Sequence, residues 1–264
     1  MFVLFACACT AWNGQRYDFH GHCDLLLLKS PHFGQGHPTH PQDQGLAIHI
    51  RSAPYREVFS YISDIAIQIG DQILESGAGG KHSLNGEPQA LGATERLAGY
   101  QVRSEQTEKG RYIYSVRIGN GQENHYHGQE LFIREYKDWI SISLLHAKPA
   151  DFRGSIGLMG SYPLATWYGR DGVTIHTDMN EFGSDWIIQG DVDGFLFQEP
   201  SLFPDKCALP SQDASTKRRR LHESSFTRAE ALEACAHWPP EAIEDCVMDV
   251  LVADDLGMAL NVPF

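Results

Sequence analysis

Cysteine is the residue type with the most specific chemistry in this sequence, because a thiol is either oxidised to a disulfide or used as a metal ligand. Six cysteines lie near the two ends of the chain, as Cys7, Cys9, Cys23, Cys207, Cys235 and Cys246. No two of them form the Cys-x-x-Cys pair that is typical of zinc sites. An even number of cysteines fits disulfides in an oxidising compartment, and reduced, buried cysteines are the competing interpretation.

Histidines offer a second kind of chemistry, since imidazole binds zinc and copper. Three close pairs occur, namely His20 with His22, His37 with His40, and His125 with His127. Residues i and i+2 of a strand point to the same face, so the two His-x-His pairs have a spacing that suits a metal. The sequence places no third ligand near either pair, which favours the interpretation that these are surface histidines.

Carboxylates and aromatic rings are the remaining candidates, because glycosidases use a pair of carboxylates and indole rings stack on sugars. The residues concerned are Asp138, Asp151, Asp171, Glu181, Trp139, Trp167, Tyr168 and Trp186. Trp139 and Trp186 fall in predicted strands and are expected in the core. Trp167 and Tyr168 precede a glycine in a loop and are the better surface candidates. No Gly-x-Ser-x-Gly, His-Glu-x-x-His or phosphate-binding loop occurs, so we expect no catalytic residue.

The charge balance narrows the range of partners. With 34 acidic against 21 basic residues the formal net charge is −13, whereas nucleic acids and anionic membranes require a basic face. No apolar run approaches the roughly 18 residues that span a bilayer. We therefore expect neither nucleic-acid binding nor membrane insertion.

Short strands dominate the pattern of the first 205 residues. Apolar and polar residues alternate around Ile48, Ile67, Val116, Ile133 and Ile142, and the segment from Asp24 to Lys29 carries four leucines. Further short strands are predicted at Val173 to Ile175 and Trp186 to Ile188, while residues 77–99 are predicted to be mainly loop. Many short strands without a long helix between them predict an antiparallel β-sandwich of two packed sheets.

The composition changes after this region. Residues 206–221 are polar and end in a basic run, which predicts a linker. A capping-box pattern at Thr227 and Glu230 then opens a helix, and a second helical pattern follows. Residues 222–264 are thus predicted to form a small helical module, in which a disulfide between Cys235 and Cys246 would join the two helices. The apolar start of the chain loosely resembles a signal peptide, but we favour a chain that begins inside a longer domain.

Several segments, taken in order, resemble the von Willebrand factor type D domain over roughly residues 9–200. They are Tyr17-Asp18-Phe19-x-Gly21-x-Cys23, the strands around Ile48 and Ile67, Gly157-Leu158-Met159-Gly160-Ser161-Tyr162, and Phe182-Gly183-Ser184-Asp185-Trp186 as a closing strand. The C-terminal segment around Cys235 and Cys246 resembles the small module that often follows such a domain. Met159 departs from the family pattern, which has a cysteine there.

The resemblance implies a calcium site at one loop end, with Asn13, Ser161, Asp171 and Asp178 as its ligands. Calcium prefers six to eight oxygen ligands, and this set carries little charge, so its affinity should be weak. The resemblance also implies functional disulfides, and Cys207 with Cys9 or Cys7 would close the two ends of the domain.

These observations predict a non-enzymatic extracellular module of a multi-domain protein, mainly β, with domains at 1–205 and 222–264. Its role would be structural or adhesive, through contact with other protein modules or matrix components, with self-association possible and calcium adding stability. The alternative is a carbohydrate-active β-sandwich, either a lectin or a glycosidase.

Overall fold

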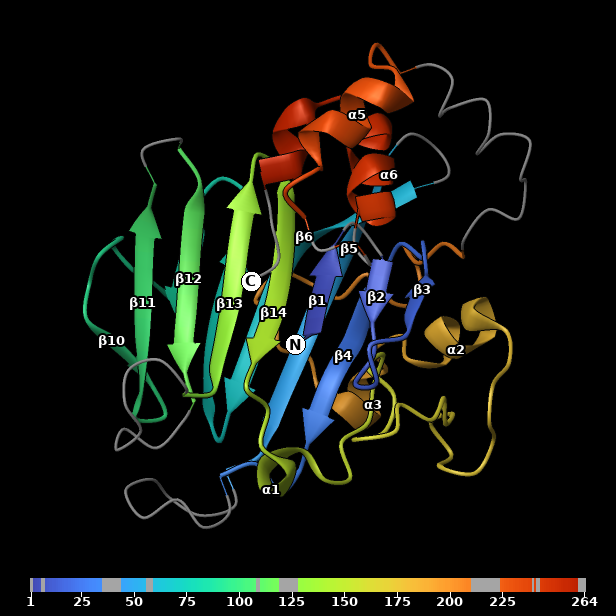
Figure 1. The fold of residues 1–264 in the computed structure, drawn as a ribbon. Helices are drawn as coiled ribbons and strands as arrows, with labels where there is room; N and C mark the ends of the chain where they lie inside the picture. The colour runs from blue at the N-terminus through green and yellow to red at the C-terminus, as the bar shows by residue number, and fades with distance from the viewer. Residues whose placement is uncertain are drawn as a thin grey trace.

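The computed structural model describes residues 2–5, 8–34, 44–55, 59–107, 110–118, 128–209, 224–238, 240 and 243–260. It is mainly antiparallel β with a small helical part at the C-terminal end, which confirms the predicted fold class (Figure 1). No helix in this part of the chain is long and apolar enough to cross a membrane.

Fourteen strands form one hydrogen-bonded antiparallel sheet. They are β1 (Phe2–Phe5), β2 (Ala8–Thr10), β3 (Arg16–Asp18), β4 (Asp24–Ser30), β5 (Leu46–Tyr55), β6 (Phe59–Ile69), β7 (Gln72–Gly77), β8 (Lys81–Leu84), β9 (Glu87–Pro88), β10 (Glu95–Leu97), β11 (Tyr100–Gln106), β12 (Tyr112–Arg117), β13 (Glu130–Tyr136) and β14 (Trp139–Leu145). The alternating segments are therefore strands as predicted, but residues 77–99 contain β8 to β10 and are not mainly loop.

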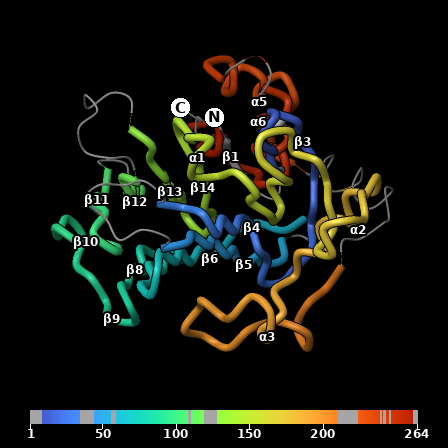
Figure 2. The backbone as a smooth tube through the Cα atoms, turned by 90° about the horizontal axis from the view of Figure 1, so that it is seen from below, coloured from blue at the N-terminus to red at the C-terminus, as the bar shows by residue number. Residues whose placement is uncertain are grey.

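The sheet is folded into two facing layers, which is consistent with the predicted sandwich (Figures 1 and 2). One layer contains β4 to β9, and the other contains β10 to β14 followed by β1, β2 and β3. The layers are joined where Ile62 of β6 pairs with Ile140 of β14. Beyond that pair, β6 continues alongside β7 and β14 continues alongside β1.

A single hydrophobic core fills the space between the layers. Ile48, Ile65 and Ile67 from one layer and Ile133 and Ile142 from the other are each at most 1% exposed. The apolar residues of the alternating segments were predicted to face the core, and these isoleucines do so. Their removal from water is the main stabilising contribution to the fold.

Both edges of β4 are paired, and all four of its leucines are buried. On one edge β4 pairs with β5, and on the other the backbone of Leu158 donates to Leu26 and that of Ile188 donates to Asp24. Gly157 permits this close approach, because its φ is +118° and a Cβ there would lie 2.6 Å from the Leu27 oxygen. The segment after Trp186 is thus held against β4 by an isolated bridge and is not a full strand.

Three short helices, α1 (Pro149–Phe152), α2 (Met179–Asp185) and α3 (Gly190–Asp193), follow the last strand. Residues 195–203, here called the strap, then cross the outer face of the layer that contains β5 and β6 (Figure 2). Leu196 and Phe197 of the strap pack on Ala47 and Ala66.

The C-terminal helices are α5 (Arg228–Ala234), α6 (Ile243–Ala253) and the 3₁₀ helix η2 (Leu256–Leu260). Thr227 and Glu230 form the predicted capping box. The helices pack against Tyr136 and Trp139 at one end of the sheet (Figure 1), and Lys137 and Tyr136 both contact the Asp255 carboxylate. The small helical module therefore has its own apolar cluster and also contacts the β-domain.

Candidate functional site

The segments that carry the family resemblance meet in one packed cluster beside β4. The Tyr17 hydroxyl donates to the Leu158 carbonyl, and the Tyr17 ring lies 5.8 Å from the Phe182 ring, centroid to centroid. Phe19 lies directly on Gly183, where a Cβ would come within 2.2 Å of the Phe19 ring. Gly183 is thus required by the aromatic side chain of a segment about 160 residues earlier in the chain, and the separate motifs have one structural cause.

The structure corrects the secondary structure of the last of these motifs. Phe182 and Gly183 lie in α2 and not in a closing strand. Asp178 is the N-cap of this helix and accepts hydrogen bonds from the backbone of Asn180 and Glu181. The Asp-x-x-Glu spacing at the start of α2 is a helix signal in the sequence that the strand prediction overlooked.

Two disulfides occur among the residues that the structure describes. Cys235 and Cys246 are bonded, which confirms the predicted link between α5 and α6. Cys207 is bonded to Cys23, so the expected bond of Cys207 with Cys9 or Cys7 is wrong. The backbones of His22 and Ala208 pair beside Cys23 and Cys207 and bring the two chain segments together. Cys9 is buried in the core, and Cys7 lies outside the described residues.

Two of the predicted calcium ligands, Asn13 and Ser161, lie in segments that are in contact. Asn13 reaches the loop that contains Ser161, since its side-chain nitrogen donates to the Leu164 carbonyl at 3.2 Å. Asp171 accepts from the backbone nitrogens of Val173 and Thr174 and from the Thr174 hydroxyl, and these bonds lower its pKa to about 2. Asp171 closes a turn and Asp178 caps a helix, so each carboxylate already has a structural role.

No group of three or more histidine, cysteine, aspartate or glutamate side chains in the described ranges has the geometry to hold a metal ion. His20 is buried, 5.3 Å from the Phe59 ring, and His22 belongs to the bridge with Ala208, so neither lies in a strand. The other two histidine pairs lie outside the described residues.

Two of the candidate carboxylates, Asp138 and Asp151, lie at opposite ends of β14. Asp138 is exposed in the turn before β14, whereas Asp151 lies in α1, beyond the opposite end of the same strand. Asp151 is buried and accepts from Gln129 and Gly34, which gives it a structural role. Asp171 and Glu181 are exposed in the hairpin and in α2. Asp138 and Asp151 therefore do not form the pair that glycoside hydrolysis needs.

The aromatic candidates lie in different environments. Trp186 is buried as predicted, and Trp139 lies between the sheet and the helical module. Trp167 is partly buried and packs on Tyr17 and Phe182, whereas Tyr168 is 36% exposed.

Tyr168 belongs to a short hairpin, residues 168–175, here called the apolar hairpin. Tyr168 and Ile175 pair across it, and Val173 and Ile175 are 79% and 58% exposed. Arg170 anchors the apolar hairpin to the protein through both oxygens of Asp193 and the carbonyls of Asp185 and Ile187. No local sequence pattern predicts this anchor, because Asp193 lies 23 residues after Arg170 in the chain.

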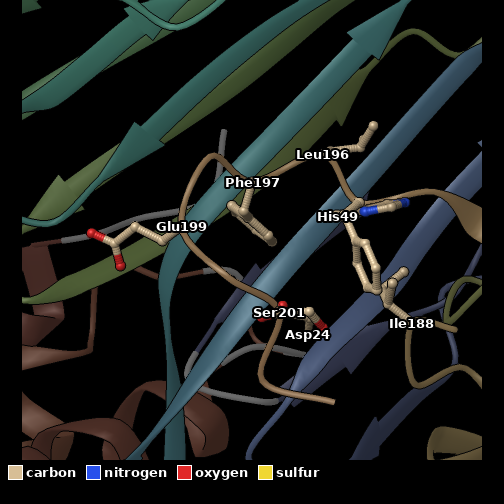
Figure 3. Close-up of a pocket in the computed structure, with 8 residues that line it drawn as sticks. Asp24, His49, Ile188, Leu196, Phe197, Glu199 and Ser201 are labelled. Carbon is tan, nitrogen blue, oxygen red and sulfur yellow. The ribbon is translucent and has the colours of Figure 1, made fainter. Parts of the chain in front are cut away.

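A small pocket beneath the strap is lined in part by Asp24, His49 and Glu199 (Figure 3). Asp24 forms a bidentate buried ion pair with Arg51, whose guanidinium lies 4.5 Å from the centre of the Phe197 ring. His49 is 1% exposed and neither ring nitrogen has a hydrogen-bond partner. Burial lowers the pKa of His49 to about 4. His49 was not predicted to be buried, because it alternates with Ile48 and Ile50 in β5 and was expected to face solvent.

Comparison with known proteins does not identify a family for this chain. No protein-family model matches the chain, and no curated protein shows significant similarity to it.

Proposed function

We propose that this chain is a non-catalytic structural module of an extracellular protein, built on the plan of a von Willebrand factor type D domain. It would act through contact with other protein modules or matrix components. The proposal includes a weak calcium site of low ligand charge where Asn13 meets the loop that contains Ser161.

The observation that carries this proposal is the Cys23–Cys207 disulfide. It joins the start of β4 to the segment that follows the strap, so one covalent bond links the first scaffold element to the end of the β-domain. Disulfides persist in oxidising compartments and are rare in the reducing cytosol, which supports an extracellular location. The convergence of Tyr17, Phe19, Leu158 and Gly183 supports the family resemblance on physical grounds.

The two disulfides should contribute unequally to stability. In the chain-entropy model a disulfide stabilises by restricting the unfolded chain, and the effect grows with loop length. The separations of 184 and 11 residues correspond to about 5 and about 3 kcal/mol respectively.

Urea unfolding of the double variants C23A/C207A and C235A/C246A tests this proposal, with the wild type measured with and without a reductant. We expect the first variant to lose more free energy of unfolding than the second, and the reductant to lower the wild-type midpoint strongly. A variant without all four of these cysteines is the control and should respond less to the reductant than the wild type does. An unchanged wild-type midpoint in reductant would contradict the proposal.

A further inference from the structure

The apolar hairpin exposes three apolar side chains on one small element. Val173 is 79% exposed, Ile175 is 58% exposed, and Tyr168 pairs with Ile175 across the hairpin. Single exposed apolar residues are common on proteins, but a group of them on one projecting element is typical of an interaction site. The solvation cost of these side chains would be relieved if a partner covered them.

The apolar hairpin is held rigid from both ends. At its tip, Asp171 accepts three hydrogen bonds from Val173 and Thr174, with donor–acceptor distances of 2.6 to 2.9 Å. At its base, the Arg170 guanidinium donates to Asp193, Asp185 and Ile187 and lies 5.1 Å from the centre of the Trp186 ring. A surface that is ordered before binding loses little conformational entropy on binding. The hairpin is therefore built as a fixed surface.

The charges around the apolar hairpin define the partner. Three carboxylates that are exposed or partly exposed lie beside the hairpin, namely Asp171 within it and Glu181 and Asp185, which both lie within 4 Å of His176 at its end. Arg170 is already paired with Asp193. The Glu181 side chain is 74% exposed and lies 3.9 Å from His176, at the end of the hairpin. The hairpin thus presents aliphatic side chains within an acidic surface, which is complementary to a basic partner.

We infer that the apolar hairpin is a docking surface for a polypeptide segment that carries aliphatic side chains between lysines or arginines. The inference rests on the proposed function as a protein-binding module, and it names the surface and the chemistry of the partner. A second copy of the chain is a poorer occupant, because two acidic faces would be brought together.

The probe for this inference is a labelled ten-residue peptide of alternating valine and lysine with blocked ends. It is titrated into the full chain, and its fluorescence anisotropy is measured. Two control peptides replace the valines by serine or the lysines by glutamate. We expect the valine–lysine peptide to bind at least tenfold more tightly than either control, and we expect its binding to weaken when salt is raised.

Substitutions in the protein locate the binding surface. V173S/I175S should weaken binding of the valine–lysine peptide at least tenfold. The matched control is Leu91→Ser, which removes a side chain that is 40% exposed in the turn between β9 and β10 and should leave binding unchanged. E181Q should weaken binding at low salt more than at high salt. The thermal midpoint of each variant verifies that it is folded.

Three results would overturn the inference. They are equal binding of the valine–lysine and serine–lysine peptides, undiminished binding by a folded V173S/I175S variant, and self-association through the hairpin without peptide binding. If both disulfides are intact and the chain does not bind the peptide, the inference about the hairpin is refuted and the proposed function is not. A chain whose native cysteines are reduced refutes the proposed function, whatever the peptide does.

Discussion

His49 should make the stability of this protein decrease in mild acid. The side chain lies on β5 beneath the strap, 1% exposed, and neither ring nitrogen has a hydrogen-bond partner. Burial is the main reason that its pKa falls from 6.5 to about 4. Lys29 and Arg170 act in the same direction, whereas the carboxylates of Asp193 and Asp24 act in the opposite one.

The size of this loss of stability follows from the difference between the pKa values of His49 in the folded and unfolded states. Above pH 6.5 the imidazole is neutral in both states, so it adds no pH dependence. As pH falls below 6.5, the unfolded chain binds a proton that the folded protein does not accept until about pH 4. Each pKa unit is worth about 1.4 kcal/mol, so the folded state loses about 2 kcal/mol by pH 5 and roughly 3 kcal/mol by pH 4.

The substitution that isolates this effect is His49→Leu, which keeps a side chain of similar size and removes both ring nitrogens. Urea unfolding followed by tryptophan fluorescence at pH 7.5 and pH 5.0 gives the loss of free energy for each protein. The carboxylates titrate in both proteins, so the loss in the variant should be smaller by about 2 kcal/mol.

At pH 7.5 the His49→Leu variant should be at least as stable as the wild type, because a buried polar group without partners is costly. The control is His146→Asn, which removes an exposed histidine at a positive φ that asparagine tolerates. An equal loss of free energy between the two pH values in wild type and His49→Leu would refute the reasoning.

Three further predictions concern stability. Gly183→Ala should destabilise the fold by several kcal/mol, because its Cβ would lie 2.2 Å from the Phe19 ring; F19A/G183A should show strong non-additivity in urea unfolding. Arg51→Leu should cost about 3–5 kcal/mol, since it leaves the buried Asp24 carboxylate without its ion pair; D24L/R51L should recover much of this loss, and a double variant no more stable than R51L would contradict that. Millimolar calcium should raise the thermal midpoint slightly relative to EDTA, an increase that Asn13→Ala should remove.

The strands were predictable from the sequence because their information is local. In β5, Leu46, Ile48 and Ile50 alternate with polar or small residues and are buried as predicted, although the residues of the other parity, Ala47, His49 and Arg51, are buried as well. The capping box at Thr227 is equally local, since its two members are three residues apart. The disulfide between Cys235 and Cys246 followed because both residues lie on neighbouring short helices.

The remaining features depend on residues that are far apart in the chain. Cys23 finds Cys207 because the backbones of His22 and Ala208 pair, which no local pattern indicates. His49 appeared to face solvent because the strap that covers it lies about 150 residues later. Asp178, which is also a predicted calcium ligand, caps α2, and this role depends on its local backbone.

A non-reducing peptide map is the direct test of the proposal that this chain is a disulfide-linked extracellular module. The protein is expressed with a secretion leader, alkylated without reduction, digested and analysed by mass spectrometry. We expect recovery from the medium with Cys23 linked to Cys207 and Cys235 linked to Cys246. Folded protein in which these four cysteines are alkylated as free thiols would contradict it.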